Sequence, residues 1–138
     1  MTDDFDLLME RARGEEGRFG HREHVHLAWL AVREYGTPGA IERIGAGIRR
    51  VAEYAGRPQR YNVTVTRAWI ELVGHHVVAE PEIDDFHAFT DRHPALLDKR
   101  LLSRFYRSIT LASAPARRGW VEPDRAPFPW IAEPRPDA

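Results

Sequence analysis

Two histidines, His21 and His24, stand three positions apart in a segment with helical periodicity. On a helix this spacing places both imidazole rings on one face. The small residues Ala28 and Ala31 continue that face and leave room for a ligand. Imidazole titrates near neutral pH, so such a pair suits general acid–base catalysis. In this interpretation both residues are catalytic, with His24 as the proton carrier and His21 orienting it.

The same pair allows two other interpretations. Two imidazoles one turn apart can supply two ligands to zinc or iron, but a metal site needs at least a third. The segment has no HExxH spacing and no carboxylate nearby on the same face. Alternatively, the rings only form hydrogen bonds at the start of a buried helix. No metal ligand is therefore assigned, the cofactor stays unknown, and a metal held through His21 and His24 remains an alternative.

A second polar group, Tyr61, Asn62, Thr64 and Thr66, lies at the start of a later periodic segment. If a helix begins here, Asn62 or Thr64 caps it. In the functional interpretation Tyr61, Asn62 and Thr64 bind substrate, because an amide and hydroxyls at a helix N-terminus suit an anionic or carbonyl group. The segment thus predicts either a helix cap or one wall of a binding site.

Tyr106 and Arg107 belong to a basic face on the last predicted long helix. Arginine can hold a carboxylate or phosphate through two hydrogen bonds, so we expect one of these two residues to close the substrate site. The same basic face can equally pair with the acidic residues of the N-terminal helix. Its other members are Arg100, Ser103, Arg104 and Ser108, with Arg117 and Arg118 beyond.

The apolar periodicity predicts an all-α fold, a single-domain bundle of five or six helices. One helix follows Thr2 and ends at Gly14, and Gly36 separates the next two. Residues 61–66 alternate as a strand would, but no second strand is available to pair with them, so we predict a helix there. The expected helices cover residues 2–13, 21–35, 37–55, 62–78, a short stretch after Asp84, and 94–109, with a brief turn after Ser113.

The C-terminal segment has a different composition. Five of the ten prolines lie in the last sixteen residues, so this part cannot be the interior of a helix or sheet. We predict a helical domain over residues 1–122 and an ordered proline-rich strap over 123–138 packed on it. A tail that docks a partner is the alternative. The apolar residues that favour packing are Trp120, Phe128, Trp130 and Ile131.

Composition narrows the class of protein. The 20 basic and 21 acidic residues of the 138-residue chain nearly cancel, which disfavours a nucleic-acid partner and allows a homodimer. The chain has no cysteine, an acidic N-terminus and no long apolar run. We therefore expect a cytoplasmic protein without a membrane span, acting on a small-molecule ligand.

Four segments together resemble a group of short, uncharacterised bacterial proteins that contain histidines and are helical. The segments are FxHxxHVxLAW from Phe19, YNxTxTxAW from Tyr61, LLDKxLL from Leu96 and ARRGWVEPD from Ala116. The resemblance implies a bacterial origin and covers nearly the whole chain, but it implies no known activity. The group has Tyr-His-Glu-Thr where this chain has Tyr61-Asn62-Val63-Thr64. A metal site formed by His21, His24 and position 62 would therefore be broken here.

These observations lead to two functional hypotheses. The first is a small-molecule-processing enzyme that uses histidine acid–base chemistry in an interhelical pocket. The second is a non-catalytic module that binds a ligand or partner through the same pocket or the aromatic tail. An enclosed pocket at the histidines favours the first, and an open apolar groove around residues 120–130 favours the second.

Overall fold

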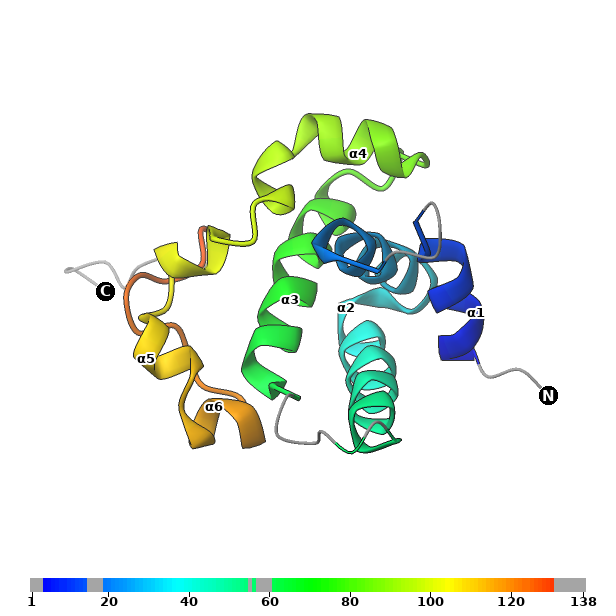
Figure 1. The fold of residues 1–138 in the computed structure, drawn as a ribbon. Coiled ribbons are helices and arrows are strands. Elements are labelled where there is room, and N and C mark those ends of the chain that lie inside the picture. The colour runs from blue at the N-terminus through cyan, green and yellow to red at the C-terminus, as the bar shows by residue number, and fades with distance from the viewer. Residues whose placement is uncertain (1–3, 15–18, 55, 57–60, 131–138) are drawn as a thin grey trace.

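The computed structural model describes residues 4–14, 19–54, 56 and 61–130, and all regular structure in these ranges is helical (Figure 1). The all-α bundle predicted from the sequence is therefore confirmed. None of the helices in these ranges has the length and hydropathy that a membrane span requires. The elements are α1 (Asp4–Ala12), α2 (His21–Tyr54), α3 (Val63–Ala79), α4 (Phe86–Arg92), the 3-10 helices η3 (Pro94–Leu97) and η4 (Leu101–Arg104), α5 (Ser108–Leu111) and α6 (Ala114–Arg118).

Helix α2 consists of two arms that meet at Gly36. The backbone of Gly36 has a φ of 77° and a ψ of 169°, outside the helical region, and Pro38 lies in the first turn of the second arm. Glycine adopts a positive φ without steric cost, and proline is tolerated in a first turn. The predicted break between residues 35 and 37 is thus confirmed, and Figure 1 shows the two arms running in different directions.

Helices α1 and α3 pack on opposite sides of this bent element. From α1, Phe5, Leu8 and Ala12 are buried. A side chain at Gly47 would overlap the Phe5 ring, so the close approach of α1 to the second arm depends on that glycine. Helix α3 runs beside both arms of α2 and buries Ile70 among other apolar residues. The bend therefore creates a corner that α3 closes.

The region after α3 differs from the prediction of one long helix over residues 94–109. It contains η3, η4 and α5 as separate short elements. The carboxylate of Asp98 accepts the backbone N–H of Arg100 at 2.9 Å, and such local bonds compete with continuous helix. Leu97 and Ile109 are consequently 37% and 69% exposed rather than part of one apolar face. Helix α4 is capped by Asp85, whose carboxylate accepts the Ala88 N–H.

The segment that follows α6, residues 119–130 of the described chain, lies across the short elements, and we call it the strap. Phe128 is only 2% exposed, and its ring packs against the ring of Phe105 with centroids 5.1 Å apart. Farther along, Trp130 stacks on His75 of α3 at 4.6 Å. The Arg125 N–H donates to the Phe105 carbonyl at 2.8 Å. The ordered strap is confirmed as far as Trp130, whereas Ile131 and the other residues of 131–138 lie outside the described ranges.

Candidate functional site

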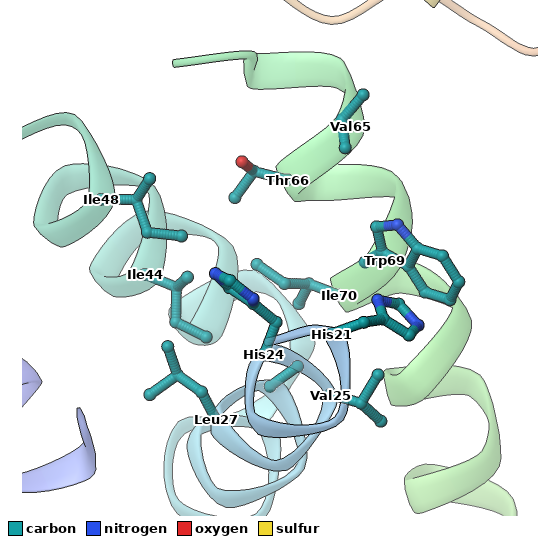
Figure 2. Close-up of a pocket in the computed structure, with 11 residues that line it drawn as sticks. His21, His24, Val25, Leu27, Ile44, Ile48, Val65, Thr66, Trp69 and Ile70 are labelled. Atoms are coloured by element: carbon teal, nitrogen blue, oxygen red, sulfur yellow. The ribbon is translucent and has the colours of Figure 1, made fainter. Parts of the chain in front are cut away.

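A cavity of about 240 Å³ lies between the two arms of α2 and the adjoining face of α3 (Figure 2). The first arm contributes both histidines of the pair that the sequence singled out, the second arm contributes two isoleucines, and α3 contributes the opposite wall. Apart from the two imidazoles and one hydroxyl, the lining side chains are hydrophobic. The lining residues are His21, His24, Val25, Leu27, Ala28, Ile44, Ile48, Val65, Thr66, Trp69 and Ile70.

The ring of His24 is held in one orientation by the backbone. Its Nδ1 lies 2.8 Å from the carbonyl oxygen of Gly20. A carbonyl can only accept a hydrogen bond, so Nδ1 carries the hydrogen, and in the neutral ring Nε2 is left as an acceptor. Figure 2 shows the ring reaching between Ile44 and Ile70, into the space that the two helices enclose. Gly20, rather than His21, is therefore the group that orients His24.

The surroundings of His24 favour its neutral form. The apolar groups around the ring lower its pKa below the usual value, and the nearby His21 lowers it further. The hydrogen bond to Gly20 and the charge of Glu23 act in the opposite direction, but the net shift is downward. At neutral pH the ring is therefore uncharged, and its Nε2 can accept a hydrogen bond or a proton.

His21 faces the same cavity but is held by a different element. Its Nε2 lies 2.9 Å from the Leu96 carbonyl of η3, so Nε2 donates that hydrogen bond. The ring packs edge-on against Trp69, with centroids 4.4 Å apart. His21 therefore links the first turn of α2 to η3 and α3, and it forms one side wall of the cavity.

The structure does not bring Asn62 or Thr64 to this cavity. The Asn62 Oδ1 accepts the Val65 N–H at 2.9 Å and caps α3, while its Nδ2 donates to the Leu111 carbonyl at 2.8 Å. Thr64 is fully buried on another side of α3, where its hydroxyl contacts the strap. Tyr61 is half-buried with its hydroxyl beside Gly45. All three belong to the packing around the N-terminus of α3.

Tyr106 and Arg107 are likewise not among the residues that line the cavity. Tyr106 is fully buried, donates its hydroxyl hydrogen to the Val121 carbonyl at 2.7 Å, and has a pKa raised chiefly by burial. Arg107 has an exposed side chain, and its backbone N–H donates to Asp124 at 3.0 Å. Both residues hold the strap.

The predicted basic face is dispersed in the same way. Arg100 pairs with Asp98 at 3.2 Å, within its own turn. In the N-terminal helix, Asp4 pairs with Arg43 of α2 at 3.4 Å, not with an arginine of the predicted basic face. Because the last segment is not one helix, its arginines do not lie on one helical face.

Thr66 is a member of the Tyr61–Thr66 polar group that does line the cavity, and Trp69 is a lining residue that the sequence did not single out. They share a face of α3 with Ile70, at spacings of three and four residues. The signal was present, since Thr66 precedes an aromatic and an aliphatic residue at helical spacing. What the sequence did not reveal is that this face, rather than the Asn62–Thr64 face, meets α2.

A second cluster of histidines joins α3 to α4. The ring of His76 stacks on His93 at 3.9 Å, and His93 Nε2 lies 2.7 Å from a carboxylate oxygen of Glu80. Burial, with added repulsion from His93 and His75, lowers the pKa of His76 to about 4. Glu80 also pairs with Arg92. The cluster fastens the end of α3 to the α4 segment.

Comparison of the chain with protein families, curated proteins and solved structures found no match. The resemblance to short bacterial proteins therefore stays a prediction. In the described part of the chain, no three histidine, aspartate or glutamate side chains are grouped so that they could hold a metal ion. The geometry of the cavity is thus the basis for any functional proposal.

Replacing Asn62 by alanine is expected to lower the free energy of unfolding by about 1–3 kcal/mol, because it removes a helix cap and leaves the Leu111 carbonyl without its donor. Asn62→Ser is the matched control, since its hydroxyl oxygen can still cap α3 while the Nδ2 donor to Leu111 is lost. We expect its cost to be smaller in urea titrations followed by circular dichroism. A loss of ligand affinity without loss of stability in Asn62→Ala would instead restore Asn62 to the binding site.

Proposed function

We propose that the protein binds a small neutral molecule in the cavity between α2 and α3. In this proposal His24 is the general base and accepts a proton from that molecule. The observation that carries the proposal is the orientation of His24, whose Nδ1 is bonded to Gly20 so that Nε2 is the acceptor in the cavity. His21 serves as a wall and a positioning group in this proposal. The activity is acid–base processing of a small molecule.

The polarity of the cavity supports a neutral ligand. Eight of its eleven lining residues are hydrophobic, and the other three are His21, His24 and Thr66. None of the eleven is a lysine, arginine, aspartate or glutamate, so a charged ligand would lose hydration and find no permanently charged side chain as its partner. The His24 side chain is exposed to solvent, so a ligand that covers its ring would displace the water that competes for Nε2 and would strengthen the hydrogen bond to that nitrogen.

Binding without catalysis is the second candidate, and one observation favours it. The partner of His24 Nδ1 is a neutral carbonyl. In catalytic triads a carboxylate occupies this position and stabilises the imidazolium that forms during proton transfer. A carbonyl fixes the ring in place but stabilises the imidazolium less, so the same geometry also suits a ligand-binding module.

The test is a panel of small neutral metabolites screened for ligand-induced melting shifts. A ligand present at about one hundred times its Kd adds about 2.7 kcal/mol of stability, which corresponds to a shift of about 5–10 °C for a domain of this size. We expect His24→Ala to remove the shift. The matched control is His87→Ala, because His87 is an exposed histidine on α4 and should leave the shift unchanged.

Turnover then separates the two candidates. For any molecule that binds, His24→Ala should reduce kcat by a factor of about 10²–10⁴ if the residue is a general base. If a molecule binds and the native protein shows no detectable turnover of it, the protein is a ligand-binding module and not an enzyme for that molecule. Equal melting shifts in native protein and His24→Ala would contradict both versions of the proposal.

A further inference from the structure

We propose that the ligand of the α2–α3 cavity is a neutral monocyclic phenol whose hydroxyl donates to His24 Nε2. This inference rests on the proposed function and adds the chemical class of the ligand. Four observations carry it: the volume of the cavity, the lack of charge in its lining, the neutral imidazole acceptor, and the aromatic and branched aliphatic walls.

The volume of the cavity fits one ring. A cavity of roughly 150 Å³ lined by aliphatic and aromatic residues is sufficient for benzene in another protein. At about 240 Å³, the cavity described here has space for one six-membered ring and one or two small substituents. Larger fused ring systems with side chains would exceed it. The size therefore favours a compound such as a substituted phenol.

The lining selects against ionised compounds. Among the eleven lining residues there is no lysine or arginine to pair with a carboxylate or phosphate, and no carboxylate to pair with an ammonium group. Transfer of an unpaired charge into such a site is strongly unfavourable. Benzoate-like and phosphorylated compounds are thus poor ligands, whereas an uncharged phenol enters without that cost.

The acceptor at His24 selects for an acidic hydroxyl. Its Nε2 has a lone pair, because Nδ1 carries the ring hydrogen that is donated to Gly20. A phenolic hydroxyl has a pKa of about 10, so it is uncharged at neutral pH. It is also a better donor to a neutral nitrogen than an aliphatic alcohol, whose hydroxyl is less acidic. A methoxy group cannot donate at all.

The walls suit a flat ring. Trp69, with His21 packed edge-on against it, supplies an aromatic wall on one side. Branched side chains from the second arm and from α3 face the cavity, and Figure 2 shows Ile44 and Ile70 on either side of the His24 ring. An aromatic ring packed against another aromatic ring gains more than the burial of its area alone provides. Thr66 supplies the one hydroxyl of the lining, on the α3 side.

The experiment uses four compounds that share a methyl-substituted six-membered ring: 4-methylphenol, toluene, 4-methylanisole and 4-methylcyclohexanol. Their affinities are measured by isothermal titration calorimetry on the full chain. We expect 4-methylphenol to bind at least tenfold more tightly than toluene and 4-methylanisole, and at least threefold more tightly than 4-methylcyclohexanol. In His24→Ala the preference over toluene should fall below twofold, while His87→Ala should retain it.

A second measurement locates the bound compound independently of any substitution. The ¹⁵N chemical shift of Nε2 in the neutral His24 ring should move when 4-methylphenol is added and stay unchanged with toluene. Lowering the pH through the His24 pKa should weaken the binding of 4-methylphenol, because the protonated ring has no acceptor nitrogen. The binding of toluene should stay nearly unchanged. His21 and Glu23 are the titratable neighbours that act on this ring.

The outcomes distinguish this inference from the proposed function. If 4-methylphenol binds no more tightly than toluene, or leaves the His24 nitrogen unchanged, the phenol assignment is overturned. If 4-methylcyclohexanol binds more tightly than 4-methylphenol through His24, the aromatic class is wrong while His24 remains the acceptor. If no compound of this set or of the metabolite panel depends on His24, the proposed function fails as well.

Discussion

Replacing Phe128 by alanine is expected to lower the free energy of unfolding by about 3–5 kcal/mol, the usual cost of removing a buried phenylalanine. The ring is 2% exposed and anchors the strap. It packs against Phe105 and Tyr106 of the underlying segment and stacks on Trp130 with centroids 4.8 Å apart. Among the described strap residues 119–130, Phe128 alone is fully buried. Alanine at this position should therefore detach the strap from the underlying helices. Urea unfolding followed by circular dichroism measures the change.

Ile109→Ala is the control for this substitution. Ile109 is also a large hydrophobic residue of the C-terminal region, but it is 69% exposed. Its replacement should change the free energy of unfolding by no more than about 0.5 kcal/mol. Comparable losses for the two variants would mean that the strap is not anchored by Phe128.

The second large effect is expected at Thr64, which is fully buried between α3 and the strap. Its hydroxyl donates to the Gly119 carbonyl at 2.7 Å and accepts the Val121 N–H at 3.1 Å. Thr64→Val keeps the volume but leaves both backbone groups without a partner. We expect the free energy of unfolding to fall by about 2–4 kcal/mol, since each buried polar group left unpaired costs about 1–3 kcal/mol.

Thr64→Ser separates the hydroxyl from the methyl group. Serine retains both hydrogen bonds and loses one buried methyl, which should cost only about 1 kcal/mol. Valine is therefore expected to be the more damaging substitution in the same urea titration, although it is the better match in shape. The reverse order would show that packing, and not the pair of hydrogen bonds, holds the strap at this point.

Thr64 and Thr66 show how α3 serves two parts of the molecule. Residues two positions apart on a helix are rotated by about 200° around its axis, so these two side chains point in nearly opposite directions. Thr64 bonds to the strap, and Thr66 lines the cavity with Trp69 and Ile70. The strap thus helps to position the helix that forms one wall of the candidate site. Substitutions that release the strap should weaken ligand binding indirectly.

Local signals in the sequence determined most of the helix boundaries. The glycine at position 36 and the asparagine at position 62 act on their own backbone, through a positive φ and a cap to the Val65 N–H. The pairing of His21 and His24 on one face is also local, since it depends only on the helical repeat. These features involve neighbours within one turn, so the sequence contains the information that fixes them.

Only the tertiary structure decided which polar residues share a site. Asn62 and Thr64 have the composition of a binding site, but their partners are the carbonyls of Leu111 and Gly119, 49 and 55 residues away along the chain. His24 instead faces a cavity whose walls come from three helical segments. Each face of a helix meets either a neighbouring element or solvent, and burial across the whole molecule decides which. Spacing along one segment therefore shows which residues lie together, and packing determines what they meet.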